Sequence, residues 1–269
     1  MDPLHSEMVR QLRKFDNDQG YKREYDDVKQ DLAPVMEAII AQGNSCLPEL
    51  HALISNEETW SCLFALEILK ELKNEESIPF LIAFIRKNED GEYWEACDDA
   101  LFALQAIGKP AIGPILSELR ELFKEEIYLG YLVGALTEIK EDRVYAFMVE
   151  LVGQYINAPS QFKEWFEIDD FTHGFVEQKN KEALPLLKQI VEMDHLEEQQ
   201  VIELNDTIEA LEDPEAYERS VEELREKIRI EKGKPGKNDP CHCGSEIKYK
   251  KCCMEEDLRE KERKLRGEG

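Results

Sequence analysis

Apolar residues recur at helical spacing through most of residues 1–230, and glycine and proline are sparse there. A short element repeats within this region: an apolar residue, often followed by proline, and then an amphipathic stretch. Five positions mark the repeat, at intervals of 31, 34, 32 and 40 residues: Leu47, Ile78, Ile112, Val144 and Leu184. Two helices per unit at such a period are typical of an α-solenoid. The pattern predicts an all-α fold of stacked helix pairs.

Each repeat has local features that fit this interpretation. Proline at the first helical position has no N–H to lose and presets φ, so it favours a helix start there. Ser77 is a candidate N-cap for the helix that begins at Ile78. Small residues at Ala65, Ala103 and Ala135 would let the paired helices approach closely. The body resembles the HEAT-like repeat family, with about five units over about 30–215, and this resemblance implies a protein-binding scaffold.

The longest interval contains an irregular segment, 157–183, in which aromatic residues alternate with acids. Its aromatic residues are Phe162, Trp165, Phe166, Phe171 and Phe175. They either pack back onto the solenoid as an insertion or form a patch that binds a partner, since aromatic anchors are frequent at interfaces. Trp60 and Trp94 lie near expected inter-helix turns, and we expect both in the core.

Charge divides the chain into two parts. The net charge is −25, yet residues 233–269 carry ten basic and eight acidic side chains, which leaves 24 basic and 51 acidic ones in 1–232. A body this acidic should repel the phosphate backbones of nucleic acids, which excludes DNA binding by residues 1–232. The chain has no apolar run of membrane-spanning length and no signal-like N-terminus, so we expect a cytoplasmic protein.

The body offers little that resembles an active site. It has no glycine-rich phosphate loop and no HExxH motif, and its histidines, among them His173 and His195, are dispersed. Cys46, Cys62 and Cys97 lie in apolar helical patterns and are expected to be buried small hydrophobic residues. We therefore expect no catalytic residues and no enzyme activity.

The composition changes at residues 231–240, where glycines, prolines and lysines predict a flexible linker between a helical-repeat domain at 1–230 and the tail. Beyond it, at 241–253, four cysteines are spaced C-x-C-x8-C-C: Cys241, Cys243, Cys252 and Cys253. Four thiolates suit the tetrahedral preference of Zn²⁺ and would close its coordination sphere, which indicates a structural metal. A segment this short needs the metal to fold. The remaining residues, 254–269, are expected to form a weakly stable helical tail.

The stretch from Asn238 to Cys253 closely resembles the SEC-C motif, the zinc-binding element at the C-terminus of the SecA translocation ATPase and of many otherwise unrelated proteins. The four cysteines, Gly244 and the stretch Lys248-Tyr249-Lys250 match the motif, whereas His242 replaces a common proline and Glu246-Ile247 replaces a usual Gly-Lys. The resemblance implies zinc as the metal, with iron possible, and a chaperone-, secretion- or ribosome-related partner.

The basic residues of the tail are candidates for contact with that partner. They are Lys248, Lys250 and Lys251, grouped around Tyr249. On a metal-rigidified knob they would bind an acidic protein surface or a ribosome. The alternative is a metal knuckle that only stabilises the end of the chain.

Two functions remain open at this point. The first is a non-enzymatic adaptor that holds a protein client on the solenoid and docks a second partner through the SEC-C module. The second is an enzyme or regulatory subunit whose active site lies on the concave face of the solenoid.

Overall fold

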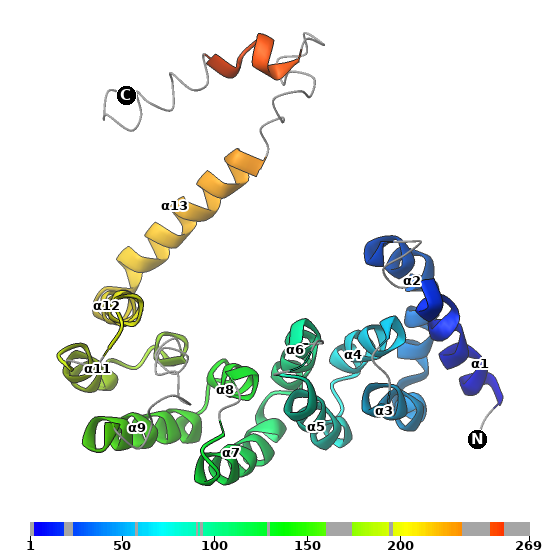
Figure 1. Ribbon diagram of the computed structural model, residues 1–269, viewed down its shortest axis with the longest axis horizontal. Helices are drawn as coiled ribbons and strands as arrows, with labels where there is room; N and C mark the ends of the chain where they lie inside the picture. Colours follow the sequence, from blue (N-terminus) through cyan, green and yellow to red (C-terminus); the bar gives the residue numbers. More distant parts are fainter. Residues whose placement is uncertain are drawn as a thin grey trace. The chain divides into compact units, whose positions relative to one another are not determined.

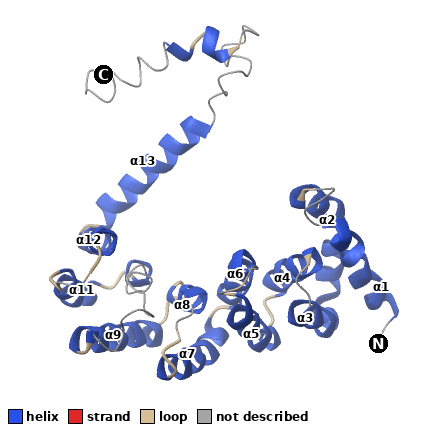
Figure 2. Ribbon diagram, viewed as in Figure 1, coloured by secondary structure: helices blue, strands red, loops and turns tan. Residues whose placement is uncertain are grey.

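The computed structural model describes residues 3–18, 24–56, 59–89, 91, 94–127, 130–159, 174–193, 196–232 and 248–255. These residues form helices and turns and contain no strand element (Figure 2), which confirms the predicted all-α class. Contacts divide the chain into two compact units, Met1–Glu212 and Asp213–Gly269.

The first unit is a succession of helices joined by short turns. Its α-helices are α1 (Pro3–Leu12), α2 (Tyr25–Gln42), α3 (Leu47–Asn56), α4 (Trp60–Leu72), α5 (Ile78–Asn88), α6 (Cys97–Ile107), α7 (Lys109–Lys124), α8 (Gly130–Thr137), α9 (Asp142–Asn157), α11 (Leu184–Val191) and α12 (Glu198–Glu212). A further helical segment covers residues 174–178.

Helices α3 to α8 stack as pairs in two layers (Figure 1). Within pairs, α3 packs on α4, α5 on α6, and α7 on α8. Between pairs, α2, α4, α6 and α8 contact one another in sequence to form one layer, and α3, α5 and α7 form the other. Each pair thus buries its apolar face against its neighbours, which is how a solenoid is stabilised.

Three of the five register marks read from the sequence coincide with the first residue of a helix. Helices α3, α5 and α11 begin at the marks Leu47, Ile78 and Leu184, each followed directly by proline. The mark Val144 lies two residues inside α9, and the mark Ile112 lies inside α7, which begins three residues earlier at Lys109. A different proline, at position 110, opens that helix, while Pro114 lies inside it and leaves one backbone carbonyl without its usual donor.

The turn between α6 and α7 consists of Gly108 alone. This residue adopts φ 77°, a positive value that glycine reaches without steric cost. Its N–H bonds to Leu104 O at 3.0 Å, and its carbonyl accepts from Ala111 N at 2.8 Å. One residue therefore ends one helix and begins the next.

A contact distant in sequence caps the start of α4. Asp16 accepts hydrogen bonds from Ser61 N at 2.9 Å and from Ser61 Oγ at 2.8 Å. The carboxylate satisfies a backbone donor that the first turn of a helix leaves free, and its charge suits the positive end of the helix dipole. The segment before α2 is thereby attached to the solenoid.

The core confirms some side-chain predictions and corrects one. Cys46, Cys62 and Cys97 are all buried, as expected, and burial raises the pKa of the Cys97 thiol to about 12. Trp60 is buried at the start of α4. The prediction for Trp94 was wrong: it lies in a short 3-10 turn before α6 and is 50% exposed.

Part of the irregular segment packs back onto the solenoid. Phe175 is fully buried, and its ring lies edge-on to Tyr145 of α9 with centroids 5.8 Å apart. Gln178 Nε2 donates to the carbonyls of Thr137 and Ile139 at the end of α8. For Phe175 the packing interpretation is therefore confirmed; Phe162, Trp165, Phe166 and Phe171 lie outside the described residues.

The second unit begins with the 19-residue helix α13 (Pro214–Lys232). The domain end expected at residue 230 falls inside this helix, and the first two residues of the expected linker are helical. The rest of that linker, residues 233–240, lies outside the described residues.

Candidate metal centre and a histidine hollow

Residues 248–255 form the described part of the cysteine-rich tail. A single 3-10 turn, Tyr249–Lys251, is closed by hydrogen bonds from Lys251 N to Lys248 O at 2.8 Å and from Cys252 N to Tyr249 O at 3.0 Å. At Cys252 the backbone leaves the helical region, with φ −124° and ψ −103°. The turn thus ends where the thiols begin.

The two adjacent thiols of this turn point to the same place. Cys252 Sγ and Cys253 Sγ lie 3.7 Å apart and are not joined by a disulfide. Neighbouring side chains of an extended strand would point to opposite faces, so the bend at Cys252 is what brings the two sulfurs together.

This separation can be compared with that of two thiolates on one metal. At a Zn–S length of about 2.3 Å and a tetrahedral angle, two sulfur ligands lie about 3.8 Å apart. The observed 3.7 Å therefore fits a shared tetrahedral ion. Both thiols are partly exposed, which leaves a path for an ion to reach them.

The remaining predicted ligands, Cys241 and Cys243, lie outside the described residues, as does His242. Within the described ranges, no group of three or more metal-ligating side chains occurs. The structure thus brings together one half of the predicted ligand set, and the four cysteines stay a prediction as a set.

The predicted contact residues of the tail differ in exposure. Lys248, Lys250 and Lys251 are exposed, whereas Tyr249 is only 7% exposed. A buried ring offers little surface to a partner. The three ammonium groups are therefore the accessible part of this turn.

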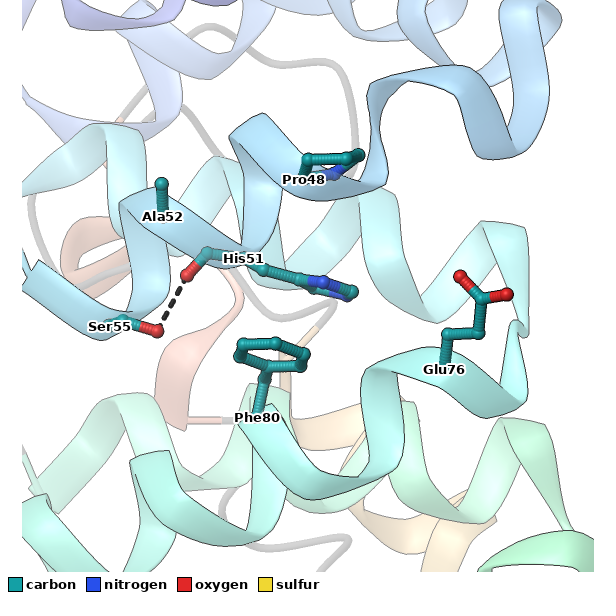
Figure 3. A pocket seen from close by; sticks show the side chains of 6 residues that line it. All are labelled: Pro48, His51, Ala52, Ser55, Glu76 and Phe80. Carbon is teal, nitrogen blue, oxygen red and sulfur yellow. Dashed lines mark hydrogen bonds between the residues drawn. The ribbon is translucent and has the colours of Figure 1, made fainter.

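A histidine that the sequence analysis did not single out lies in a hollow between α3 and α5 (Figure 3). The imidazole of His51 stacks on the ring of Phe80, with centroids 4.0 Å apart and planes 14° apart. Its Nε2 forms a 2.9 Å hydrogen bond with Ser77 Oγ. Burial lowers the pKa of His51, while the nearby charge of Glu76 acts in the opposite direction.

The geometry of this hollow resembles a nucleophile–base pair but does not serve as one. The hydroxyl of Ser77 is fully buried, so a substrate has no access to it. Ser77 instead links the start of α5 to α3 through His51. The pair is therefore structural. No sequence signal identifies this pair, because the contact depends on the spacing between α3 and α5.

None of the described helices is long and apolar enough to cross a membrane. The two histidines considered for an active site, His173 and His195, lie outside the described residues.

Comparison with known proteins identifies the tail. Residues 238–255 match the model of the SEC-C motif family. The chain is also 26% identical over 262 residues to the protein translocase subunit SecA of a Nitratiruptor species. That alignment covers 94% of this chain and 28% of the SecA sequence. No solved structure matches.

Proposed function

We propose that this chain, which carries a SEC-C motif at residues 238–255, is a non-enzymatic metal-binding adaptor. In this proposal the helical body holds a protein client. The metal-bound tail docks a second partner, either an acidic protein surface or the ribosome. The similarity to a translocase subunit supports a partner from protein secretion.

The observation that carries the proposal is the 3.7 Å separation of the Cys252 and Cys253 sulfurs. Cys241 and Cys243 would complete the ligand set. Zn²⁺ is the expected ion, with iron as the alternative, and a bound ion would hold the turn rigid without taking part in a reaction. A rigid turn presents its three exposed lysines at low entropic cost, which favours docking.

The metal is tested on the full chain purified without added metal. Elemental analysis should give close to one equivalent of zinc or iron per chain. The double variant Cys252→Ser/Cys253→Ser should lose it, because two of the four ligands are gone. Stoichiometric metal in the double variant would mean that the site lies elsewhere.

The docking role is tested with Lys248→Glu/Lys250→Glu/Lys251→Glu. This triple variant should keep its metal, because the ligands are unchanged. Exposed ion pairs are each worth about 0.2–1 kcal/mol, so losing three should weaken partner binding by about threefold to a hundredfold. Cosedimentation with ribosomes from the native cells and co-purification at increasing salt measure the loss.

A matched control makes the same three Lys→Glu changes on the body instead of the tail. The positions are three exposed lysines of the first unit: Lys87, Lys124 and Lys188. This control should keep the tail's partner. Equal binding by wild type and the tail variant would refute the docking role and leave the tail as a metal-stabilised chain end.

A further inference from the structure

The layer formed by α2, α4, α6 and α8 exposes aromatic and acidic side chains next to one another. We call these residues the acidic–aromatic strip: Glu67, Trp94, Glu95, Asp98, Asp99 and Phe102. The strip lies on α4, on the short turn before α6 and on α6 itself, and α4 packs directly against α6.

At its α2–α4 end the strip is held by a hydrogen-bonded carboxylate. Glu67 Oε1 accepts from Tyr25 OH at 2.8 Å and from Lys29 Nζ at 2.7 Å. The Tyr25 ring stacks on Phe64 with centroids 5.3 Å apart, so the network rests on the core. Glu67 is therefore fixed in place before any partner arrives.

The next carboxylate, Asp99 of α6, is half-buried. Burial and then the charge of Glu67 raise its pKa, although Lys29 and Lys70 act in the opposite direction. These lysines therefore do not fully offset the cost of holding Asp99 ionised. A further cation near Asp99 would be electrostatically favourable.

A lysine of the chain itself already lies over an aromatic ring of the strip. Lys70 Nζ lies 5.5 Å from the centroid of the Phe102 ring, within the range of a cation–π interaction. Phe102 is nevertheless 44% exposed. The ring therefore keeps surface that a second cation with an apolar stem can cover.

Toward α8 the negative charge continues. Burial raises the pKa of Tyr131 to about 12, and the charges of Asp98, Glu89 and Glu95 contribute to the shift. Tyr131 N also donates to Glu89 Oε1 at 3.2 Å. The carboxylates of α6 and of the turn before it thus form one negative field with Glu89.

The charges of this surface do not balance. Among the described residues the strip holds four carboxylates (Glu67, Glu95, Asp98 and Asp99), and the cations that act on Asp99 are the two ammonium groups of Lys29 and Lys70. We infer that the acidic–aromatic strip is a docking surface for an arginine-rich segment of a protein client. This inference rests on the proposed function, because it names the surface by which the body holds its client.

The kind of partner follows from the two features together. Excess negative charge repels nucleic acid and attracts cations. The exposed rings of Trp94 and Phe102 suit a cation with a flat or apolar body, because aromatic side chains act as interface anchors. Arginine combines charge, planar stacking and bidentate pairing with carboxylates, and so fits better than lysine.

The test uses the full chain and a fluorescent peptide of alternating arginine and alanine. Fluorescence anisotropy gives its dissociation constant, with lysine and glutamate versions of the peptide for comparison. In Glu95→Gln/Asp98→Asn the affinity should fall about five- to tenfold, because two exposed charge contacts are lost. Phe102→Ala should weaken arginine-peptide binding about two- to fivefold.

A charge-matched control distinguishes binding at the strip from general attraction of the peptide to an acidic protein. Asp206→Asn/Glu209→Gln removes two exposed carboxylates of α12 and should change the affinity less than about twofold. In NMR spectra, the peptide should shift the indole N–H signal of Trp94, identified with Trp94→Phe. Equal losses in the two double variants, or an unshifted Trp94 signal, would overturn the inference.

The same measurements separate this inference from the proposed function. The peptide should bind equally well to Cys252→Ser/Cys253→Ser, because the strip lies in the first unit. If the strip variants bind the peptide normally while the tail lysines still govern partner capture, the adaptor stands and its client surface lies elsewhere. If the strip variants lose the peptide while the tail-lysine variant captures its partner as well as wild type does, the docking role fails and the strip remains.

Discussion

A methyl group added at Gly174 would collide with the core. An ideally placed Cβ at this residue lies 2.5 Å from Thr137 Cβ and 2.7 Å from Met148 Cε. Real Cβ atoms essentially never approach a β-carbon so closely, and Thr137 is itself buried. Gly174→Ala must therefore move segment 174–178 away from α8 and α9.

The magnitude follows from two opposed effects. In a helix, alanine is favoured over glycine by about 0.5–1 kcal/mol, so the substitution would stabilise an open site. Overpacking in a core costs about 1–3 kcal/mol. The 2.5 Å contact places Gly174 in the upper part of that range, about 2–3 kcal/mol, so the free energy of unfolding should fall by about 1–2 kcal/mol after about 1 kcal/mol of helical gain is subtracted.

Gly153 provides the matched control. It lies inside α9, and a Cβ added there meets nothing within 4 Å. Gly153→Ala should therefore raise the free energy of unfolding by about 0.5–1 kcal/mol. The same replacement at two helical glycines is thus expected to change stability in opposite directions.

Thermal unfolding followed by circular dichroism measures both variants. For a domain of this size, 1 kcal/mol corresponds to a change in Tm of about 2–4 °C. Gly174→Ala should thus lower Tm by about 2–8 °C, and Gly153→Ala should raise it by about 1–4 °C. A Gly174→Ala protein as stable as wild type would refute the packing of segment 174–178 on α8 and α9.

Three further predictions concern the first unit. Asp16→Ala should destabilise the unit by about 1–3 kcal/mol, because Ser61 loses the carboxylate that caps α4, and Asp16→Asn should cost less. Equal denaturation midpoints for wild type and Asp16→Ala would contradict the cap. The folded-state pKa of His51 is lowered despite Glu76, so its contribution to stability is complete above the unfolded pKa of about 6.5 and declines as pH falls below it. Urea titrations from pH 7.5 to 5 should show that decline in wild type and less of it in His51→Gln; parallel curves would exclude His51 as its source. The Cys97 thiol, with a pKa of about 12, should react with a disulfide reagent at pH 8 only when the unit opens, so a fast reaction of the folded chain would contradict its burial.

The sequence predicts best what is local. Proline fixes φ and cannot donate, so Pro48, Pro79 and Pro185 place the starts of α3, α5 and α11 without reference to the rest of the fold. The same rule fails at Pro114, because Pro110 opens α7 and Pro114 lies in its second turn, where a proline removes a backbone hydrogen bond. The helical class and the repeat period can therefore be predicted from the sequence, whereas individual helix boundaries are predicted less accurately.

Contacts and burial that depend on segments far apart in the sequence could not be predicted. Trp94 and Trp60 both precede or begin a helix, but Trp60 is buried in the core, with Tyr25 beside it, whereas Trp94 is half exposed. The partner of His51, Ser77, lies 26 residues away, in the turn directly before the next helix of its layer. For the tail, thiol spacing predicted a metal site, whereas the burial of Tyr249 depends on how the turn folds.

The single-residue joint at Gly108 also has a mechanical meaning. A joint of one residue can turn about only two backbone dihedral angles, and both neighbouring peptide groups are already hydrogen-bonded. Tension applied along the chain is therefore transmitted from α7 to α6 without a flexible segment between them. The joint from α8 to α9 contains four residues, 138–141, and has more angles to adjust. If the stack of helices bends, α6 and α7 should move together as one rigid unit, and the curvature should change at the longer joints.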